Sequence, residues 1–302
     1  MRSPFIKNAC MYRLPRDFTL SREDFHEQLA SFIFTSCGAQ DMASAGWVEV
    51  APGMLTIEHD GAYLINYCLQ KKLLPANVIN DEVAKRVKKA EEEQGRKVRR
   101  VERLTFRDEA IHSLTPRAFT REAYHYVIID LRHQRVIVEA ASATTAEDIL
   151  ALLRKTIGSL PVVPLMMNTP IELTLTEWLK AQQLPAGFSI GSDAVLHNIL
   201  EDGGSLRASK QELFSDEITK HLEAGKLATA MGLHWRERIS FRLKDDMTIK
   251  AMSFADELHD QNDDIDREDI HARITADFIL FMAELNALLA DLITALGGEY
   301  ER

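Results

Sequence analysis

The sequence predicts an α+β protein with mixed antiparallel sheets, an inserted helical segment and a long C-terminal helix. Three observations lead to this fold class. Short apolar runs separated by Gly- or Asp-containing turns occur at residues 47–69 and again at 227–254. Between two groups of such runs, residues 77–113 change to a helical period. Finally, residues 271–296 repeat apolar side chains at the spacing of one long helix face.

The first half of the chain is expected to begin with a strand at residues 5–14. Ser21 is the predicted N-cap of a following helix whose apolar face includes Phe25 and Ile33. The next predicted strands are residues 47–50, 54–58, 62–69, 123–130, 135–140 and 160–165. Thr144 or Thr145 is expected to cap a helix that ends at Gly158.

The second half contains two short predicted helices before a β-meander. The helices are expected at residues 172–180 and 215–224, with a turn at 201–204 and a strand at 206–210. The meander comprises residues 227–235, 239–243 and 248–254. The resulting domain prediction is a sheet domain of residues 1–75 with 121–165, an inserted basic helical segment of 76–120, and an α+β domain of 166–302.

Composition limits the class of protein. The chain has 302 residues, 46% of them apolar, which is enough for a substantial core. Three cysteines without a CxxC pair indicate reduced thiols in a cytosolic protein. Residues 1–14 lack the apolar run of a signal peptide, and Glu284 and Asp291 interrupt the longest apolar stretch. We therefore expect no membrane-spanning segment.

Charge is concentrated in residues 83–107. This segment holds ten Lys or Arg against four Glu, a net charge of +6, so the rest of a chain that carries −10 overall carries −16. Gly95 could split this segment into two helices, but favourably ordered pairs from Glu92 to Arg96 and from Glu93 to Lys97 bridge it and favour one continuous helix of about 38 Å. A second helix is expected at residues 107–113, before Pro116. A polyanion such as nucleic acid fits this segment. A solvated helix, a membrane surface or a protein partner remain alternatives.

An acidic run from Asp256 to Asp269 is the best candidate for catalysis. Its carboxylates could bind Mg²⁺ for phosphodiester hydrolysis, which would make the protein a metal-dependent nuclease. The alternatives are a solvated loop that complements the dipole of the last helix, or a partner contact. The sequence contains no phosphate-loop, GxGxxG, HExxH or GxSxG motif. We therefore predict no catalytic residue, metal ligand or cofactor.

Aromatic side chains divide into two kinds. Trp47, Trp178 and Trp235 are expected in the core. Phe119 follows Pro116 in a turn at the end of the basic segment, where it is either a core side chain or a contact anchor.

Several long motifs resemble the recombination-associated protein RdgC family. They are FTSCGAQDMASAGWV at residues 34–48, HSLTPRAF at 112–119, LALLRKTIGSLPVVPL at 150–165, PIELTLTEWL at 170–179, EDGGSLRASKQEL at 201–213, EITKHLEAGK at 217–226, and FADELHDQNDDIDREDI at 254–270, followed by ADFIL at 276–280. The resemblance implies a non-enzymatic protein of the cytoplasm and nucleoid that binds double- and single-stranded DNA without sequence preference. It also implies restraint of the RecA recombinase by competition for DNA.

The resemblance further implies a horseshoe subunit with a central part, a helical tip and a base, which forms a ring-shaped homodimer around DNA. Phe119, Lys210 and Gln211 are then expected at a ring-closing contact. The expected DNA-binding residues are Lys85, Arg86, Lys88, Lys89, Arg96, Lys97, Arg99, Arg100, Arg103, Arg117, Arg207, Lys210 and Lys226. Basic residues inside the ring and acidic residues outside would reconcile DNA binding with the net negative charge.

Overall fold

A computed structural model describes residues 2–198, 203–262, 264–266 and 268–300. It confirms the α+β class, the antiparallel sheets and the long C-terminal helix. The predicted turn at 201–204 begins outside the described residues, as do residues 263 and 267 of the acidic run.

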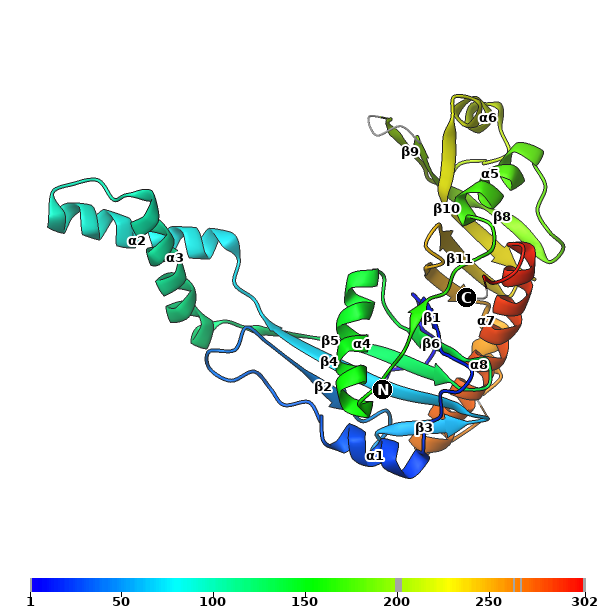
Figure 1. Ribbon diagram of the computed structural model, residues 1–302, viewed down its shortest axis with the longest axis horizontal. Helices are drawn as coiled ribbons and strands as arrows, with labels where there is room; N and C mark the ends of the chain where they lie inside the picture. The colour runs from blue at the N-terminus through cyan, green and yellow to red at the C-terminus, as the bar shows by residue number, and fades with distance from the viewer. Residues whose placement is uncertain (1, 199–202, 263, 267, 301–302) are drawn as a thin grey trace.

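The first sheet has the strand order β2-β4-β5-β6-β1-β7, with β3 also paired to β4. Its strands are β1 (Cys10–Arg13), β2 (Ala43–Val48), β3 (Thr56–His59), β4 (Ala62–Lys72), β5 (Thr120–Asp130), β6 (Arg135–Val138) and β7 (Val163–Pro164). Strands β4 and β5 pair along their whole length, from Ala62 opposite Asp130 to Lys72 opposite Thr120. Their far ends, with β2 paired to β4 along residues 66–71, extend past the other strands of the sheet and form a neck (Figure 1).

Two helices, α1 (Arg22–Ala30) and α4 (Ala143–Ile157), pack against this sheet around the buried Phe25, Trp47 and Ile149. The cap prediction for α4 was wrong by two or three residues, because Ser142 Oγ accepts the Thr145 backbone N–H at 3.3 Å. The prediction for Ile33 was also wrong. Helix α1 ends at Ala30, and Ile33 is exposed.

The second sheet has the order β12-β11-β10-β8-β9. Its strands are β8 (Phe188–Asn198), β9 (Ser205–Ala208), β10 (Lys226–Trp235), β11 (Ile239–Lys244) and β12 (Ile249–Phe254). The meander β10-β11-β12 was predicted, whereas β8 was not. Helices α5 (Ile171–Ala181) and α6 (Asp216–Glu223) pack near β10, and the short α7 (Asp256–Asp260) follows β12. Trp235 of β10 is buried as predicted, and Trp178 of α5 is only partly buried against the same core.

The long helix α8 (Ile270–Ala295) joins the two sheets in one core. Phe278, Leu285 and Leu292 are buried in a cluster that includes side chains of both sheets. By length and composition alone, α8 could cross a membrane. Two of its acidic residues instead bind the second sheet: Asp291 Oδ2 accepts from the indole of Trp235 at 2.8 Å, and Glu284 pairs with Arg238. These contacts are those of a core helix.

The basic segment is split at Gly95, which was the alternative to the continuous helix that we favoured. Helix α2 (Ala76–Gln94) ends at Gly95, which has the left-handed φ of 63°, and α3 (Arg100–Leu114) runs back beside it, followed by the 3₁₀ turn η1 (Thr115–Arg117). The helix predicted at residues 107–113 is the second half of α3. Reversal at Gly95 lets the narrow apolar faces of the two helices bury each other. A single helix would have left both faces in water.

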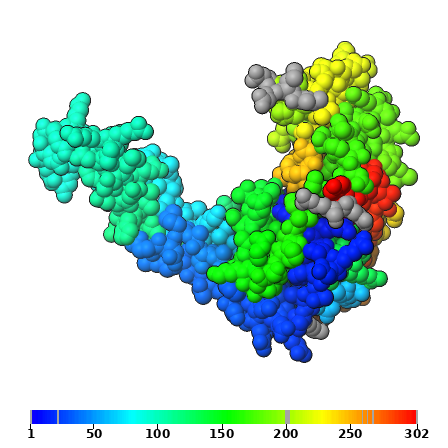
Figure 2. Space-filling view, in the orientation of Figure 1, coloured from blue at the N-terminus to red at the C-terminus, as the bar shows by residue number. Residues whose placement is uncertain are grey.

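The hairpin and the second sheet stand on opposite sides of a concave surface. Figures 1 and 2 show the α2–α3 hairpin at the end of the neck, and β9 and α6 at the far side. The neck and the first sheet form the floor between them.

Candidate nucleic-acid interface

The α2–α3 hairpin is held together by a small apolar seam. Ile79, Val83 and Val87 of α2 are buried against Ala110 of α3, with Phe106 partly buried beside them. The seam uses one face of each helix. The charged residues of both helices therefore lie on the outside of a thin projection.

The turn between the helices is organised by two glutamates. Glu91 accepts the backbone N–H of Val98 at 3.0 Å. Glu102 accepts the backbone N–H of Arg99 at 2.8 Å and binds both terminal nitrogens of Arg96 at 2.6 and 2.9 Å. The hydrogen bond from Arg96, followed by that from Arg99, lowers the pKa of Glu102 to about 2. The same contact raises the pKa of Arg96.

Some of the predicted DNA-binding cations thus already form ion pairs with carboxylates of the same chain. Arg86 is held by Glu82 at 3.2 Å, by Glu109 at 3.1 Å and by the Ser113 hydroxyl at 2.8 Å. Arg86 therefore braces α2 against α3. Two looser pairs, each at 3.9 Å and exposed, join Lys88 to Glu92 and Lys89 to Glu93. The predicted pairs of Arg96 with Glu92 and of Lys97 with Glu93 do not form, because the helix ends at Gly95.

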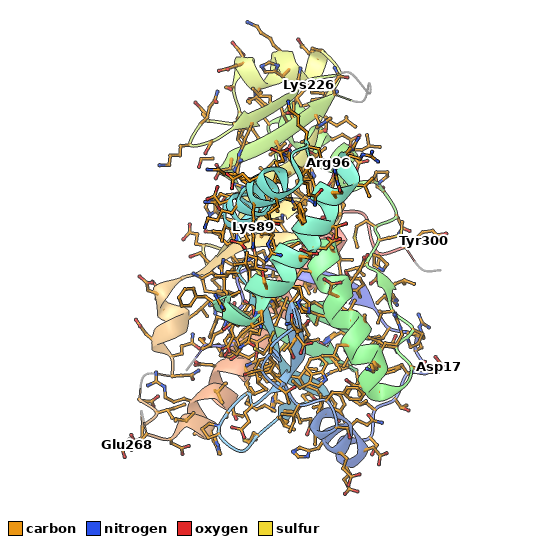
Figure 3. The ribbon with its side chains drawn as sticks, turned by 90° about the vertical axis from the view of Figure 1, so that its left-hand side faces the viewer. Asp17, Lys89, Arg96, Lys226, Glu268 and Tyr300 are labelled. Atoms are coloured by element: carbon orange, nitrogen blue, oxygen red, sulfur yellow. The ribbon has the colours of Figure 1, made fainter. Side chains whose placement is uncertain are left out.

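Other cations are exposed and have no carboxylate within 4 Å in the part of the chain that the structure describes. Those predicted from the sequence are Lys85, Lys97, Arg99, Arg100, Arg103 and Arg117. Figure 3 looks along the neck at the hairpin, where Lys89 marks α2 and Arg96 marks the turn. This excess of unpaired cations gives the hairpin a positive surface on an acidic protein.

Three further cations were not among the predicted DNA-binding residues. Arg107 lies on α3 and is exposed. Lys71 and Arg121 face each other across the β4–β5 pair of the neck, and both are exposed. Within the described residues none of the three has an ion-pair partner. Charge alone indicated Arg107, whereas the pairing of Lys71 with Arg121 depends on a strand register that the sequence did not reveal.

The remaining predicted cations lie on the second sheet. Arg207 is on β9, Lys210 follows β9 with a φ of 54°, and Lys226 begins β10. Both β9 and β10 pair with β8, so the three residues belong to the sheet at the far side of the concave surface (Figure 1), where Lys226 is labelled in Figure 3. Within one chain the structure does not bring these residues to the hairpin.

Phe119 is at the start of the neck, and its side chain is 83% exposed. Its backbone is fixed, because its carbonyl accepts the Leu73 N–H at 2.7 Å. Beside it, Lys72 Nζ donates to the carbonyls of Thr115 and Ala39 at 2.9 and 2.6 Å. Phe119 is therefore a rigidly presented apolar side chain and not part of the core.

An open pocket of about 520 Å³ lies on the second sheet at the other two predicted contact residues. It is lined by Ile190, Ser192, Lys210, Gln211, Phe214 and His234, among others. The Gln211 amide donates to Glu217 at 2.8 Å, and its backbone N–H donates to Ser192, which fixes the segment after β9. Apolar and polar side chains both line the pocket.

The acidic run surrounds the start of α8. Asp269 caps that helix by accepting the Ala272 N–H at 3.0 Å, and Asp266 accepts the Glu268 N–H at 3.0 Å. Among the described residues of the chain, no three His, Cys, Asp or Glu side chains are grouped to hold a metal ion. Within the described part of the run, Asp269 thus acts as the N-cap of α8.

Comparisons with known proteins agree with the motifs. A family model described as "Putative exonuclease, RdgC" matches residues 5–299. The Recombination-associated proteins RdgC of Yersinia pestis (strain Pestoides F) and Yersinia pseudotuberculosis (serotype O:1b) are each 50% identical over 298 residues, and that of Yersinia enterocolitica is 48% identical. Each alignment covers 98% of both chains. The chain belongs to the RdgC family.

Proposed function

We propose that the protein binds double- and single-stranded DNA without sequence specificity, encircles it as a ring-shaped homodimer, and restrains RecA-mediated recombination by occupying DNA. It would act in the cytoplasm at the nucleoid, without a cofactor and without catalysis. The name of its relatives, recombination-associated protein, supports a role on DNA.

The observation that carries this proposal is the set of unpaired cations on the hairpin and neck. A cation already bound to a carboxylate gains little from a phosphate, since the first partner must be given up. Lys97, Arg99, Arg100 and Arg103 have no such competitor within the described residues. They can neutralise phosphates and release counterions, which is the main source of non-specific affinity.

The concave surface supports a ring. One chain offers cations on the hairpin and on β9–β10, at opposite sides of the concavity (Figure 1). A second copy related by a two-fold axis would bring the hairpin of each chain to the second sheet of the other. Phe119 of one chain would then enter the pocket beside Lys210 and Gln211 of its partner. The cations of both chains would line one enclosed hole.

Salt dependence tests the proposal. In the test variant, Lys97, Arg99, Arg100 and Arg103 are changed to Gln, and in a matched control Lys7, Arg132, Lys155 and Lys180 are changed to Gln. For duplex DNA, the slope of log affinity against log salt should become shallower by up to about 0.9 for each phosphate that the test variant no longer neutralises. The control should keep the wild-type slope. Equal slopes in wild type, test variant and control would exclude the hairpin as the DNA site.

A metal-dependent nuclease that uses the carboxylates of residues 256–269 is the second candidate, because the matching family model is described as an exonuclease. Linear and plasmid DNA incubated with the protein and Mg²⁺ or Mn²⁺ should remain intact under our proposal. Degradation that disappears on changing Asp264 and Asp266 to Asn would establish the nuclease instead.

A further inference from the structure

Helix α3 carries an exposed apolar patch that the proposed phosphate contacts do not use. Val101 is 73% exposed and Leu104 is 55% exposed. Their spacing of three residues puts them side by side on the helix face that turns away from α2. The buried face of α3 is instead centred on Ala110, with Phe106 partly buried. Two large aliphatic side chains in water at the end of a thin projection need an explanation, because they do not stabilise the hairpin.

The surroundings of the patch select an anionic occupant. Arg100 and Arg103 lie within a turn of both Val101 and Leu104, and Arg107 lies within a turn of Leu104; all three lack a carboxylate partner within the described residues. The exposed Asp108 also follows Leu104 by one turn, so the three arginines leave a net positive charge around the patch. A second α3 would bring its own three arginines against them, so charge repulsion disfavours a contact between two α3 helices here. An acidic protein would need an interface of about 800 Å² on each side, far more than two aliphatic side chains offer.

We propose that Val101 and Leu104 contact the bases of single-stranded DNA while the neighbouring arginines hold its phosphates. This inference rests on the proposed DNA-binding function and adds a distinction between the two forms of DNA. A duplex presents phosphates on its outside and keeps the faces of its bases stacked. A single strand exposes those faces, so an apolar surface between cations can cover them. The patch therefore adds affinity for single strands and little for duplexes.

The test separates apolar from electrostatic binding. The double variant V101Q/L104Q keeps good helix formers at both positions, and V78Q/L173Q is a control with the same exchange at two other exposed aliphatic side chains. Affinity is measured against salt for an oligothymidylate, for an abasic strand of equal length and for a duplex of equal length. Circular dichroism and thermal melting check that each variant folds.

We expect V101Q/L104Q to weaken binding to oligothymidylate by about 3- to 10-fold at every salt concentration, with an unchanged slope. Binding to the abasic strand and to the duplex should change by less than about 2-fold. The control variant should bind all three as the wild type does.

Three outcomes would overturn the inference: an equal loss of affinity on the duplex, an equal loss on the abasic strand, or no loss on any of them. None of these would affect the proposed function, which depends on the slope. A shallower slope in the four-cation variant is the separate measure of the proposed function.

Discussion

At the scale of single residues, the contact between Arg96 and Glu102 fixes the turn of the hairpin. It also gives this exposed glutamate a pKa of about 2 in place of its ordinary value of 4.5. A carboxyl group whose pKa is lowered by folding stabilises the folded form above its ordinary pKa, and this contribution disappears as the pH falls towards the lowered value. The turn should therefore be intact at neutral pH and loosen between about pH 4.5 and pH 2.

This predicts a distinctive titration. The side-chain carboxyl resonance of Glu102, followed by NMR, should have a midpoint near 2 in the wild type. Arg96→Gln removes the largest cause of the shift, so the midpoint should move up towards 4.5. Arg86→Gln is the control, because Arg86 binds Glu82 and Glu109 and not Glu102. A midpoint near 4.5 in the wild type would show that the contact does not form in solution.

The same residues show what sequence reasoning could reach. The positions of the cations were read directly from the sequence, and the family motifs predicted DNA as their partner. The sequence could not show which cations lack an ion-pair partner, because the pairing depends on the reversal of the chain at Gly95. Because the chain reverses, Arg96 pairs with Glu102 and Arg86 pairs with Glu109, which are 6 and 23 residues away in the sequence. Pairing rules for a continuous helix considered only neighbours four residues apart.

At the scale of elements, Gly95 decides that the basic segment is a hairpin. Its φ of 63° is one that other residues adopt at a cost of about 1 kcal/mol, while a Cβ atom there would meet no atom within 4 Å. Gly95→Ala should therefore strain the turn without a clash. Amide hydrogen exchange in the last turn of α2 and the first turn of α3 should become about 5-fold faster, the factor that corresponds to about 1 kcal/mol.

Gly53→Ala is the matched control, since Gly53 has a φ of 75° and equally open surroundings in a turn of the first sheet. It should leave exchange in the hairpin unchanged. Gly95→Asn should have a smaller effect than Gly95→Ala, because asparagine tolerates the left-handed region better. Unchanged hairpin exchange in Gly95→Ala would mean that the apolar seam alone ends α2.

Strand β8 is the element that the sequence prediction missed, although part of its signal was present. Phe188, Ile190, Ala194 and Leu196 recur at every second position, but Ser192 interrupts the series and Gly191 and Asp193 are poor strand formers. Glycine is required at position 191 because a Cβ atom there would lie only 2.8 Å from the backbone of Gly232 on β10. Close packing of two strands selected this glycine, and such packing is a tertiary effect that local propensity does not contain.

At the scale of the whole molecule, two groups of cations occupy opposite sides of one concave surface. The sequence predicted residues from both groups as DNA-binding, and only the family resemblance, through its horseshoe subunit, implied that a single chain keeps them apart. Under the proposed function, a second chain would close the concavity so that both groups surround one DNA molecule. Ring closure, and not the hairpin alone, would then hold the protein on DNA at high salt.

Phe119 provides the test of closure. A closed ring that has loaded on circular duplex DNA should resist removal by high salt, which screens phosphate contacts, until the circle is cut and the ring slides off. Phe119→Ser should lower retention on circles to the level seen on linear DNA, because the partner pocket beside Lys210 and Gln211 would lose its apolar anchor. Folding should be little affected, within about 0.5 kcal/mol, since the side chain is 83% exposed. Met166→Ser, at another exposed apolar residue, should keep the wild-type difference between circular and linear DNA. Equal retention of the wild type and Phe119→Ser on circular DNA would remove Phe119 from the closing contact.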